Sequence, residues 1–135
     1  MGLNHETAPV EVREHFAVPA EQLGDRAKSL TELSTIAEGL VLSTCNRMEI
    51  YIAAEDRQMG VDILREYLAK GRSKEEMQYL YQKTGEVAKR HLFRLVCGLD
   101  SMVVGETEIF GQVKQAYKQA LESGATKGVL NRLFQ

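Results

Sequence analysis

The segment STCNRMEIY, residues 43–51, places a cysteine among polar residues directly after an apolar run. Arg47 follows Cys45 by two positions, and a nearby guanidinium favours the reactive thiolate form of a cysteine. Thr44 and Asn46 flank the thiol with a hydroxyl and an amide, which can hydrogen-bond a polar substrate. Free cysteine is more often a small buried core residue. Residue types alone therefore leave both a nucleophile and a core thiol open at Cys45.

The second cysteine, Cys97 in LVCGL, lies at the end of an apolar helix pattern and is predicted to belong to the core. Neither cysteine is part of a C-x-x-C motif, and no paired histidines accompany them, so the spacing of a metal site is absent. With no signal peptide at the N-terminus, both cysteines are expected as free thiols in a reducing cytoplasm.

A thiolate nucleophile needs a partner for proton transfer or charge stabilisation, and three histidines are candidates: His5, His15 and His91. His91 lies beside the apolar stripe of its helix, where it can face the edge of a cleft. The alternative is a histidine whose hydrogen bonds are satisfied at a helix boundary.

Polar groups also gather in LDSMVVGETEIFGQ, residues 99–112, ahead of and within the last long helix pattern. The residues are Asp100, Ser101, Glu106, Glu108 and Gln112. Such a cluster can hold the head group of an amino acid, although most polar clusters at helix starts are caps or solvated faces. Residue types alone therefore leave open whether these residues form a binding site or only caps and solvated side chains.

The elements that must position these residues follow from periodicity. Helices are predicted at about 19–33, 61–71, 86–99 and 109–124, and strands at 2–4, 40–45, 48–54 and 78–83. Gly39 is expected to break the chain before the second strand, and Ser73 with Glu76 has the pattern of a capping box. The order predicts an α+β domain with a ferredoxin-like βαββαβ core and additional C-terminal helices.

Composition sets further limits. The 135 residues suffice for one compact domain, and a mean hydropathy of -0.27 without a long apolar run excludes a membrane-spanning helix. The net charge of -2 argues against an autonomous nucleic-acid-binding module, because such modules carry a basic surplus.

Four stretches together resemble the N-terminal catalytic domain of the glutamyl-tRNA reductase family. They are GLNHETAPVEVRE (2–14), LSTCNRMEIY (42–51), HLFRLVCGLDSMVVGETEIFGQVKQAY (91–117) and LNRLFQ (130–135). The stretches follow the order of the family from one end of the chain to the other.

The resemblance implies an oxidoreductase of tetrapyrrole (porphyrin) biosynthesis, on the route to 5-aminolevulinate. The motif cysteine, Cys45, would attack the glutamyl-tRNA ester to form a thioester, which NADPH reduces to glutamate-1-semialdehyde. His91 is implied to be catalytic as well. The implied substrate-binding residues are Thr44, Cys45, Asn46, Arg47, Ser101, Glu106, Thr107, Glu108 and Gln112. No metal is implied.

Two departures from the family pattern stand out. Thr107-Glu108 replaces the usual Pro-Gln, and only Met1 precedes GLNH, so the first strand is expected to be short. Family members also continue into an NADPH-binding domain and a dimerisation domain. Residues 1–135 are therefore expected to be the catalytic domain alone, limited to acylation and ester hydrolysis.

The implied partners are glutamyl-tRNA and glutamate-1-semialdehyde aminomutase, with a homodimeric full-length protein, a monomeric fragment and no membrane. The alternative is a non-catalytic fragment that binds tRNA or a partner protein. Redox regulation through an oxidisable Cys45 is a weaker third hypothesis.

Overall fold

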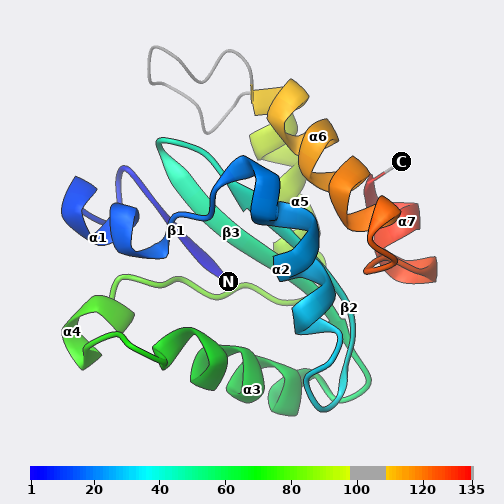
Figure 1. Ribbon diagram of the computed structural model, residues 1–135, viewed down its shortest axis with the longest axis horizontal. Coiled ribbons are helices and arrows are strands. Elements are labelled where there is room, and N and C mark those ends of the chain that lie inside the picture. Colours follow the sequence, from blue (N-terminus) through cyan, green and yellow to red (C-terminus); the bar gives the residue numbers. More distant parts are fainter. Residues whose placement is uncertain (98–108, 135) are drawn as a thin grey trace.

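The computed structural model describes residues 1–97 and 109–134, which form three strands and a set of helices (Figure 1). The strands are β1 (Gly2–Asn4), β2 (Ile36–Ser43) and β3 (Arg47–Ala54). The helices are α1 (Val10–Phe16), α2 (Leu23–Leu30), α3 (Arg57–Ala69), α4 (Lys74–Met77), α5 (Gly85–Val96), α6 (Ile109–Glu122) and α7 (Gly128–Phe134), with a short 3₁₀ turn, η1 (Ala20–Gln22), before α2. The predicted α+β class is confirmed.

The described strands form one antiparallel sheet in the order β1-β3-β2. A short turn, residues 44–46, joins β2 to β3. The predicted strand at 78–83 is wrong: only Tyr81 joins the sheet, through a single bridge to Gly2 on the outer edge of β1. Because β1 is so short, the segment after Tyr81 has no strand beside it to pair with. The ferredoxin-like plan therefore stays a prediction.

Gly39 does not break the chain but lies inside β2, which starts four residues earlier than predicted. Helix α2 packs directly over this point. A Cβ atom at Gly39 would lie 3.0 Å from the Cβ of Leu30 and 3.1 Å from the carbonyl oxygen of Ala27. The glycine is therefore needed for the close approach of helix and strand rather than for a turn.

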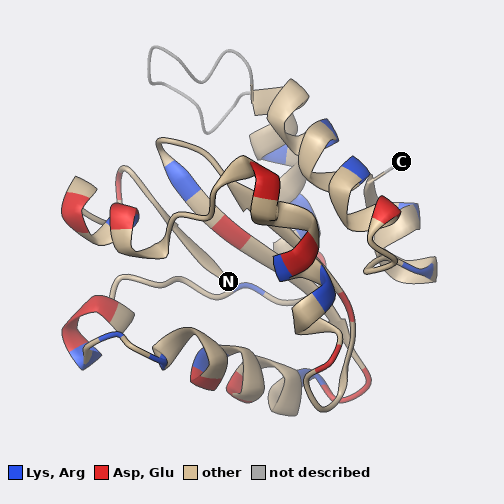
Figure 2. Cartoon of the chain, in the orientation of Figure 1, with Lys and Arg blue, Asp and Glu red and all other residues tan. Residues whose placement is uncertain are grey.

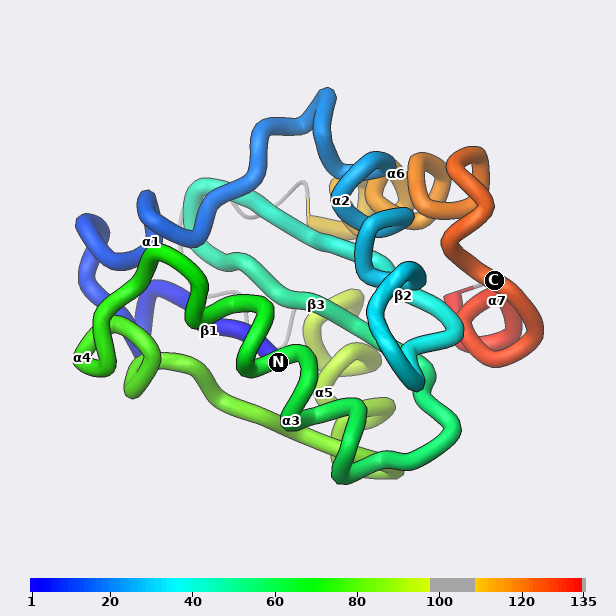
Figure 3. Tube along the Cα trace, turned by 60° about the horizontal axis from the view of Figure 1, so that its bottom comes forward, coloured from blue at the N-terminus to red at the C-terminus, as the bar shows by residue number. Residues whose placement is uncertain are grey.

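The sheet lies between two layers of helices (Figures 1 and 3). Helices α2 and α3 pack on the face that carries Val41, Met48 and Ile50, together with Phe16 from α1. Helices α5, α6 and α7 lie on the other face, where the Tyr51 ring meets Phe134 of α7 edge-on. This second layer brings α5 and α6, which carry predicted site residues, over β3.

Several local predictions are confirmed. Ser73 and Glu76 form the capping box of α4, and α6 ends before Gly124, which has a φ of +80°. The predicted helix at 19–33 is shorter and begins with the 3₁₀ turn, while α1 and α7 were not predicted. Across the described residues, none of the helices combines the length and apolarity that crossing a bilayer requires.

Candidate active site

Cys45 lies exposed at the tip of the turn between β2 and β3. The turn is held by Thr44, whose N–H donates to the carbonyl of Arg47 at 2.8 Å. The Thr44 hydroxyl in turn accepts hydrogen bonds from the N–H groups of Asn46 and Arg47, both at 3.2 Å. Thr44 thus shapes the loop that presents the thiol. Of the two roles left open for Cys45, the structure contradicts the core thiol.

Arg47 opens β3 and turns its side chain into the protein. Its Nη1 lies 3.1 Å from Oε2 of Glu49, and the two side chains are 0% and 2% exposed. The sequence suggested a guanidinium beside the Cys45 thiol; within the described residues, the structure pairs Arg47 with a carboxylate on the same strand. A buried ion pair of this kind fixes the position of the arginine.

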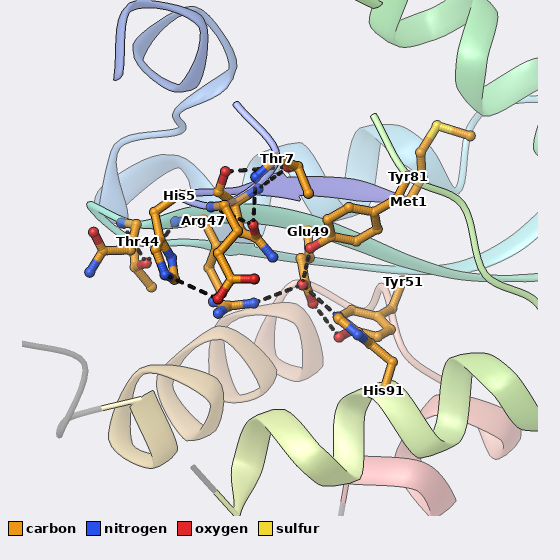
Figure 4. Close-up of polar contacts among 12 residues, drawn as sticks. Met1, His5, Thr7, Thr44, Arg47, Glu49, Tyr51, Tyr81 and His91 are labelled. Atoms are coloured by element: carbon orange, nitrogen blue, oxygen red, sulfur yellow. Dashed lines mark hydrogen bonds and ion pairs between the residues drawn. The ribbon is translucent and has the colours of Figure 1, made fainter. Parts of the chain in front are cut away.

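Glu49 is the centre of the polar cluster shown in Figure 4. Besides Arg47, its carboxylate accepts hydrogen bonds from the hydroxyls of Tyr51 and Tyr81. His91 Nε2 lies 2.7 Å from Oε2 of Glu49. Because an ionised carboxylate only accepts hydrogen bonds, this contact places a proton on Nε2 of His91. One buried carboxylate therefore joins the strand to α5 and to the Tyr81 segment.

The cluster shifts the titration of its members. Burial alone would raise the pKa of Glu49, but the hydrogen bond and charge of His91 and the hydrogen bonds of Tyr51 and Tyr81 outweigh it and lower the pKa from 4.5 to about 2. Burial, followed by the charge of Glu49, raises the pKa of both tyrosines well above 10.0. Glu49 is thus ionised and the tyrosines are neutral donors at neutral pH.

The structure places the three candidate histidines in different surroundings. His91 is half-buried, and its ring also packs against Tyr81 with the centroids 5.5 Å apart. His15 is exposed on α1 and contacts Glu76 of α4, away from the cluster. His5 lies at the same end of β3 as Thr44 (Figure 4), and its enclosed Nδ1 has no hydrogen-bond partner among the described residues.

Gln112, in the first turn of α6, is the member of the second predicted cluster that the structure describes. Its carboxamide oxygen is enclosed and has no hydrogen-bond partner among the described residues, so it is an acceptor that a ligand can satisfy. Asp100, Ser101, Glu106, Thr107 and Glu108 lie outside the described residues.

The prediction that Cys97 belongs to the core is wrong, because the residue is exposed at the C-terminal end of α5. Leu92 and Leu95 form the buried stripe of this helix. At 100° per residue, Cys97 is turned away from that stripe. Cys97 is thus a second exposed thiol.

Glu49 was not singled out from the sequence, although a signal was present. In a strand alternate residues face the same side, so Arg47, Glu49 and Tyr51 share one face of β3 while Met48 and Ile50 share the other. Three polar residues on one face of a strand that is otherwise apolar indicate a buried polar network or a site. In 1–97 and 109–134, no group of three metal-ligating side chains is close enough to hold an ion.

Comparison with known proteins gives a consistent result. The family described as "Glutamyl-tRNAGlu reductase, N-terminal domain" matches residues 1–135. A glutamyl-tRNA reductase of Akkermansia muciniphila is 50% identical, with all of this chain and 40% of that protein covered. One of Desulfitobacterium hafniense is 44% identical, with 31% of that protein covered.

A solved structure is also similar. Glutamyl-tRNA reductase from Methanopyrus kandleri superimposes with a TM-score of 0.70 and 33% identity, and the match covers 98% of this chain and 30% of that one. The chain therefore spans 40% or less of the length of these relatives. On the family match over its whole length, the chain belongs to the family of glutamyl-tRNA reductase N-terminal domains.

Proposed function

We propose that this chain is the catalytic domain of an NADPH-dependent glutamyl-tRNA reductase and that Cys45 is its nucleophile. The observation that carries the proposal is an exposed thiol at the tip of a structured turn, two residues from a buried ion pair, in a chain of this family. Polar side chains presented on loops by a rigid scaffold are where reactive groups are commonly found.

The proposed step is acyl transfer. The Cys45 thiolate attacks the carbonyl carbon of the ester that joins glutamate to the tRNA ribose. A carbon–sulfur bond forms, the carbon–oxygen bond to the ribose breaks, and the released ribose oxygen takes up a proton. The products are free tRNA and a glutamyl thioester on Cys45. A thioester is more electrophilic than the ester, and the covalent link retains the acyl group for the next reaction.

Arg47 and Gln112 are the proposed glutamate contacts within the described residues. A guanidinium is a planar fork that matches a carboxylate, and the pairing with Glu49 fixes its orientation. The enclosed carboxamide oxygen of Gln112 can accept from the substrate ammonium. Thr44 and Asn46 complete this side of the proposed pocket. Ser101, Glu106, Thr107 and Glu108 are proposed for the other side.

His91 is proposed as the acid–base or positioning group, held by Glu49. The carboxylate fixes the ring and its tautomer through the contact with Nε2. This arrangement resembles a carboxylate-oriented histidine in which the acid sets the geometry of the base.

NADPH would supply the hydride that reduces the thioester. The described sheet is antiparallel throughout and offers no parallel βαβ unit, and the sequence has no G-x-G-x-x-G loop. The residues of this chain therefore do not fit a dinucleotide, and the reductive step is proposed for other parts of the whole protein. Its homodimeric assembly and its transfer of product to glutamate-1-semialdehyde aminomutase belong to the same proposal, as does the ferredoxin-like plan.

The acylation proposal is tested by mass spectrometry of the protein after incubation with glutamyl-tRNA. We expect one glutamyl adduct, located on Cys45 and absent from Cys45→Ser. Cys97→Ser is the matched control, because Cys97 is also an exposed free thiol. It should form the adduct as the parent does. Equal adduct on the two variants, or none on the parent, would contradict Cys45 as the nucleophile.

A further inference from the structure

His5 has a largely buried ring, and the acylation step gives it no role. Its side chain is 19% exposed, and its enclosed Nδ1 has no hydrogen-bond partner within residues 1–97 and 109–134. Leaving an enclosed polar atom unpaired costs about 1–3 kcal/mol. Arg13 and Arg72 also have an unpaired Nε, but each binds a backbone carbonyl through another nitrogen of the same guanidinium. An unpaired nitrogen on a side chain that transfers protons near neutral pH points instead to a chemical role.

His5 lies in a turn that its neighbours hold in place. The side-chain oxygen of Asn4 accepts hydrogen bonds from the N–H groups of Glu6 and Thr7, at 2.9 and 3.1 Å. The carbonyl oxygen of Asn4 accepts from the N–H groups of Thr7 and Ala8, at 3.1 and 2.9 Å. The backbone that carries His5 and Glu6 is therefore fixed, and so are the directions in which their two side chains leave it.

The carboxylate of Glu6 sets the tautomer of the His5 ring. Its Oε1 lies 3.7 Å from Nε2 of His5, within the distance of an ion pair. An ionised carboxylate attracts a proton and only accepts hydrogen bonds, so the neutral ring is favoured with its proton on Nε2. The lone pair of the ring is then on Nδ1, the nitrogen that has no partner. His5 is thus a base that an acid orients.

The sheet brings the His5 turn next to the turn that carries Cys45. Asn4, the last residue of β1, pairs with Arg47, the first residue of β3. The chain leaves β1 at His5, and it enters β3 from Cys45 and Asn46 at the same end of the sheet. Neighbouring strands are about 5 Å apart. The two turns therefore emerge from the sheet one strand spacing from each other.

His91 contacts the same strand further from the thiol. Its partner Glu49 follows Cys45 by four residues, and four extended residues cover about 13 Å. Figure 4 shows His5 on the Thr44 side of the polar cluster and His91 on the opposite side. Of these two histidines, His5 is therefore the one at the end of the sheet that carries the thiol.

We propose that His5 is the base that activates Cys45, an inference that rests on Cys45 being the nucleophile of the proposed function. The Sγ atom turns toward the ring by rotation about χ1, since catalytic contacts commonly tighten when substrate binds. Nδ1 of His5 takes the proton of the thiol, and the thiolate attacks the ester carbon. The carbon–sulfur bond forms, the carbon–oxygen bond to the ribose breaks, and Nδ1 gives its proton to the departing ribose oxygen. The products are free tRNA, the thioester and a neutral His5.

The charges beside the ring favour this proton transfer. Glu6 lies in the same turn, and Arg47 lies on the paired strand (Figure 4). The charge of Arg47 is balanced by Glu49, whose Oε2 is 3.1 Å away. The carboxylate of Glu6 is then left to stabilise the imidazolium that forms when His5 takes up the proton. His91, which Glu49 holds, acts as the positioning group.

The first test measures the reactivity of Cys45 without tRNA. The chain is alkylated with iodoacetamide at pH 7, and mass spectrometry follows the Cys45 and Cys97 peptides separately. Cys97, exposed in the same molecule, is the internal reference. We expect Cys45 of the parent to react at least about tenfold faster than Cys97. His5→Gln should slow Cys45 about tenfold and leave Cys97 unchanged, and near pH 10, where thiols ionise without a base, parent and variant should react alike.

Two further variants complete this test. His15→Gln changes an exposed histidine on α1 that contacts Glu76, and it should leave both thiols as in the parent. Glu6→Gln changes an exposed side chain without altering the buried ring, and it should slow Cys45 about threefold. Unchanged reactivity of Cys45 in His5→Gln and Glu6→Gln would overturn the inference. A loss shared by Cys45 and Cys97, or one that persists near pH 10, would also overturn it, because the effect would then be structural.

The second test uses glutamyl-tRNA and separates this inference from the proposed function. Single-turnover formation of the Cys45 adduct at pH 7 should be at least about 100-fold slower in His5→Gln than in the parent, and unchanged in His15→Gln. Adduct formation by His5→Gln at the parent rate would overturn the role of His5 and leave Cys45 as the nucleophile. No adduct on the parent, with alkylation of Cys45 still dependent on His5, would instead contradict the proposed function and leave the pairing of the two side chains standing.

Discussion

Glu49 is a charged residue at a strand position where a buried apolar residue would stabilise the sheet at no electrostatic cost. The cost is offset here by four donors that all point at one carboxylate: Arg47, Tyr51, Tyr81 and His91. These donors come from β3, from the segment that bridges to β1 and from α5. The carboxylate therefore ties three parts of the fold together, and its ionisation is linked to the stability of the whole domain.

Glu49→Gln is expected to destabilise the protein in a pH-dependent way. Because the folded pKa is lowered, the carboxylate stabilises the fold at pH values above the ordinary 4.5, and this stabilisation is lost as the pH falls toward about 2. A lowering of this size corresponds to about 3 kcal/mol. Urea unfolding at pH 7 should show a loss of about this size for Glu49→Gln, partly because Arg47 is left buried beside a neutral amide.

The matched control is Glu66→Gln, which changes an exposed carboxylate on α3. Its unfolding free energy should stay within about 0.5 kcal/mol of the parent at each pH. The difference between parent and Glu49→Gln should shrink between pH 4.5 and the lowest pH at which the parent still folds. A difference that is constant over this range would show that the charge of Glu49 is not the cause.

At the scale of single residues, the sequence indicated which side chains could do chemistry better than it indicated which side chains are in contact. The neighbours of Cys45 left both a nucleophile and a core thiol open, and the structure places the thiol exposed on the turn. The contact between Arg47 and Glu49 was not predicted. Cys45 and Glu49 are both two residues from Arg47, and the direction in which the arginine side chain leaves the strand decides which of them it contacts. Cys97 was misplaced because an apolar neighbourhood in sequence does not specify which side of the helix end is buried.

At the scale of elements, α7 is held by a residue about 90 positions earlier in the chain. The buried carboxylate of Glu38, on β2, accepts hydrogen bonds from the backbone N–H groups of Lys127, Val129 and Leu130 at 2.5, 3.2 and 2.9 Å. These are the N–H groups at the start of the helix, which have no partner within it. Glu38 thus acts as an N-terminal cap supplied by the sheet.

Glu38→Ala is expected to loosen α7 and to lower the free energy of unfolding by about 2 kcal/mol, because charged hydrogen bonds to three backbone donors are lost. Hydrogen exchange should accelerate most in the amides of α7. Glu32→Ala, which changes an exposed glutamate beyond the end of α2, is the control and should leave exchange in α7 unchanged. Unaltered exchange in Glu38→Ala would show that packing alone holds the helix.

Elements with a strong local pattern, such as α5 and α6, were predicted closely, and those that depend on a distant partner were not. The capping of α7 by Glu38 has no local signal, and α7 was missed. Gly39 was expected to break the chain before the strand. The structure needs a glycine there because α2 packs closely against β2, and the local sequence carries no signal of this tertiary contact. Residues 78–83 have the composition of a strand, but a strand also needs a neighbour, and β1 provides one only at Gly2.

At the scale of the whole molecule, charge distinguishes the proposed enzyme domain from the alternative of a tRNA-binding fragment. The net charge is -2, and α2, α3 and α4 each carry residues of both signs (Figure 2). Binding to tRNA driven by phosphates needs a concentrated positive surface, and it weakens steeply with salt. The described part of the chain distributes its basic residues among acidic ones, so we expect the domain to recognise the glutamyl end more than the tRNA body.

We therefore expect residues 1–135 to bind tRNA with a dissociation constant near the weak end of non-specific binding, about 10⁻⁴ M at physiological salt. A gel-shift titration at low and moderate salt, with the parent and Cys45→Ser, measures this directly. Both proteins should bind equally weakly, and only the parent should acquire a glutamyl adduct. Micromolar binding by both proteins without an adduct on the parent would favour the alternative of a tRNA-binding fragment. The domain would then bind the body of the tRNA, and the Cys45 thiol would not contribute to the affinity.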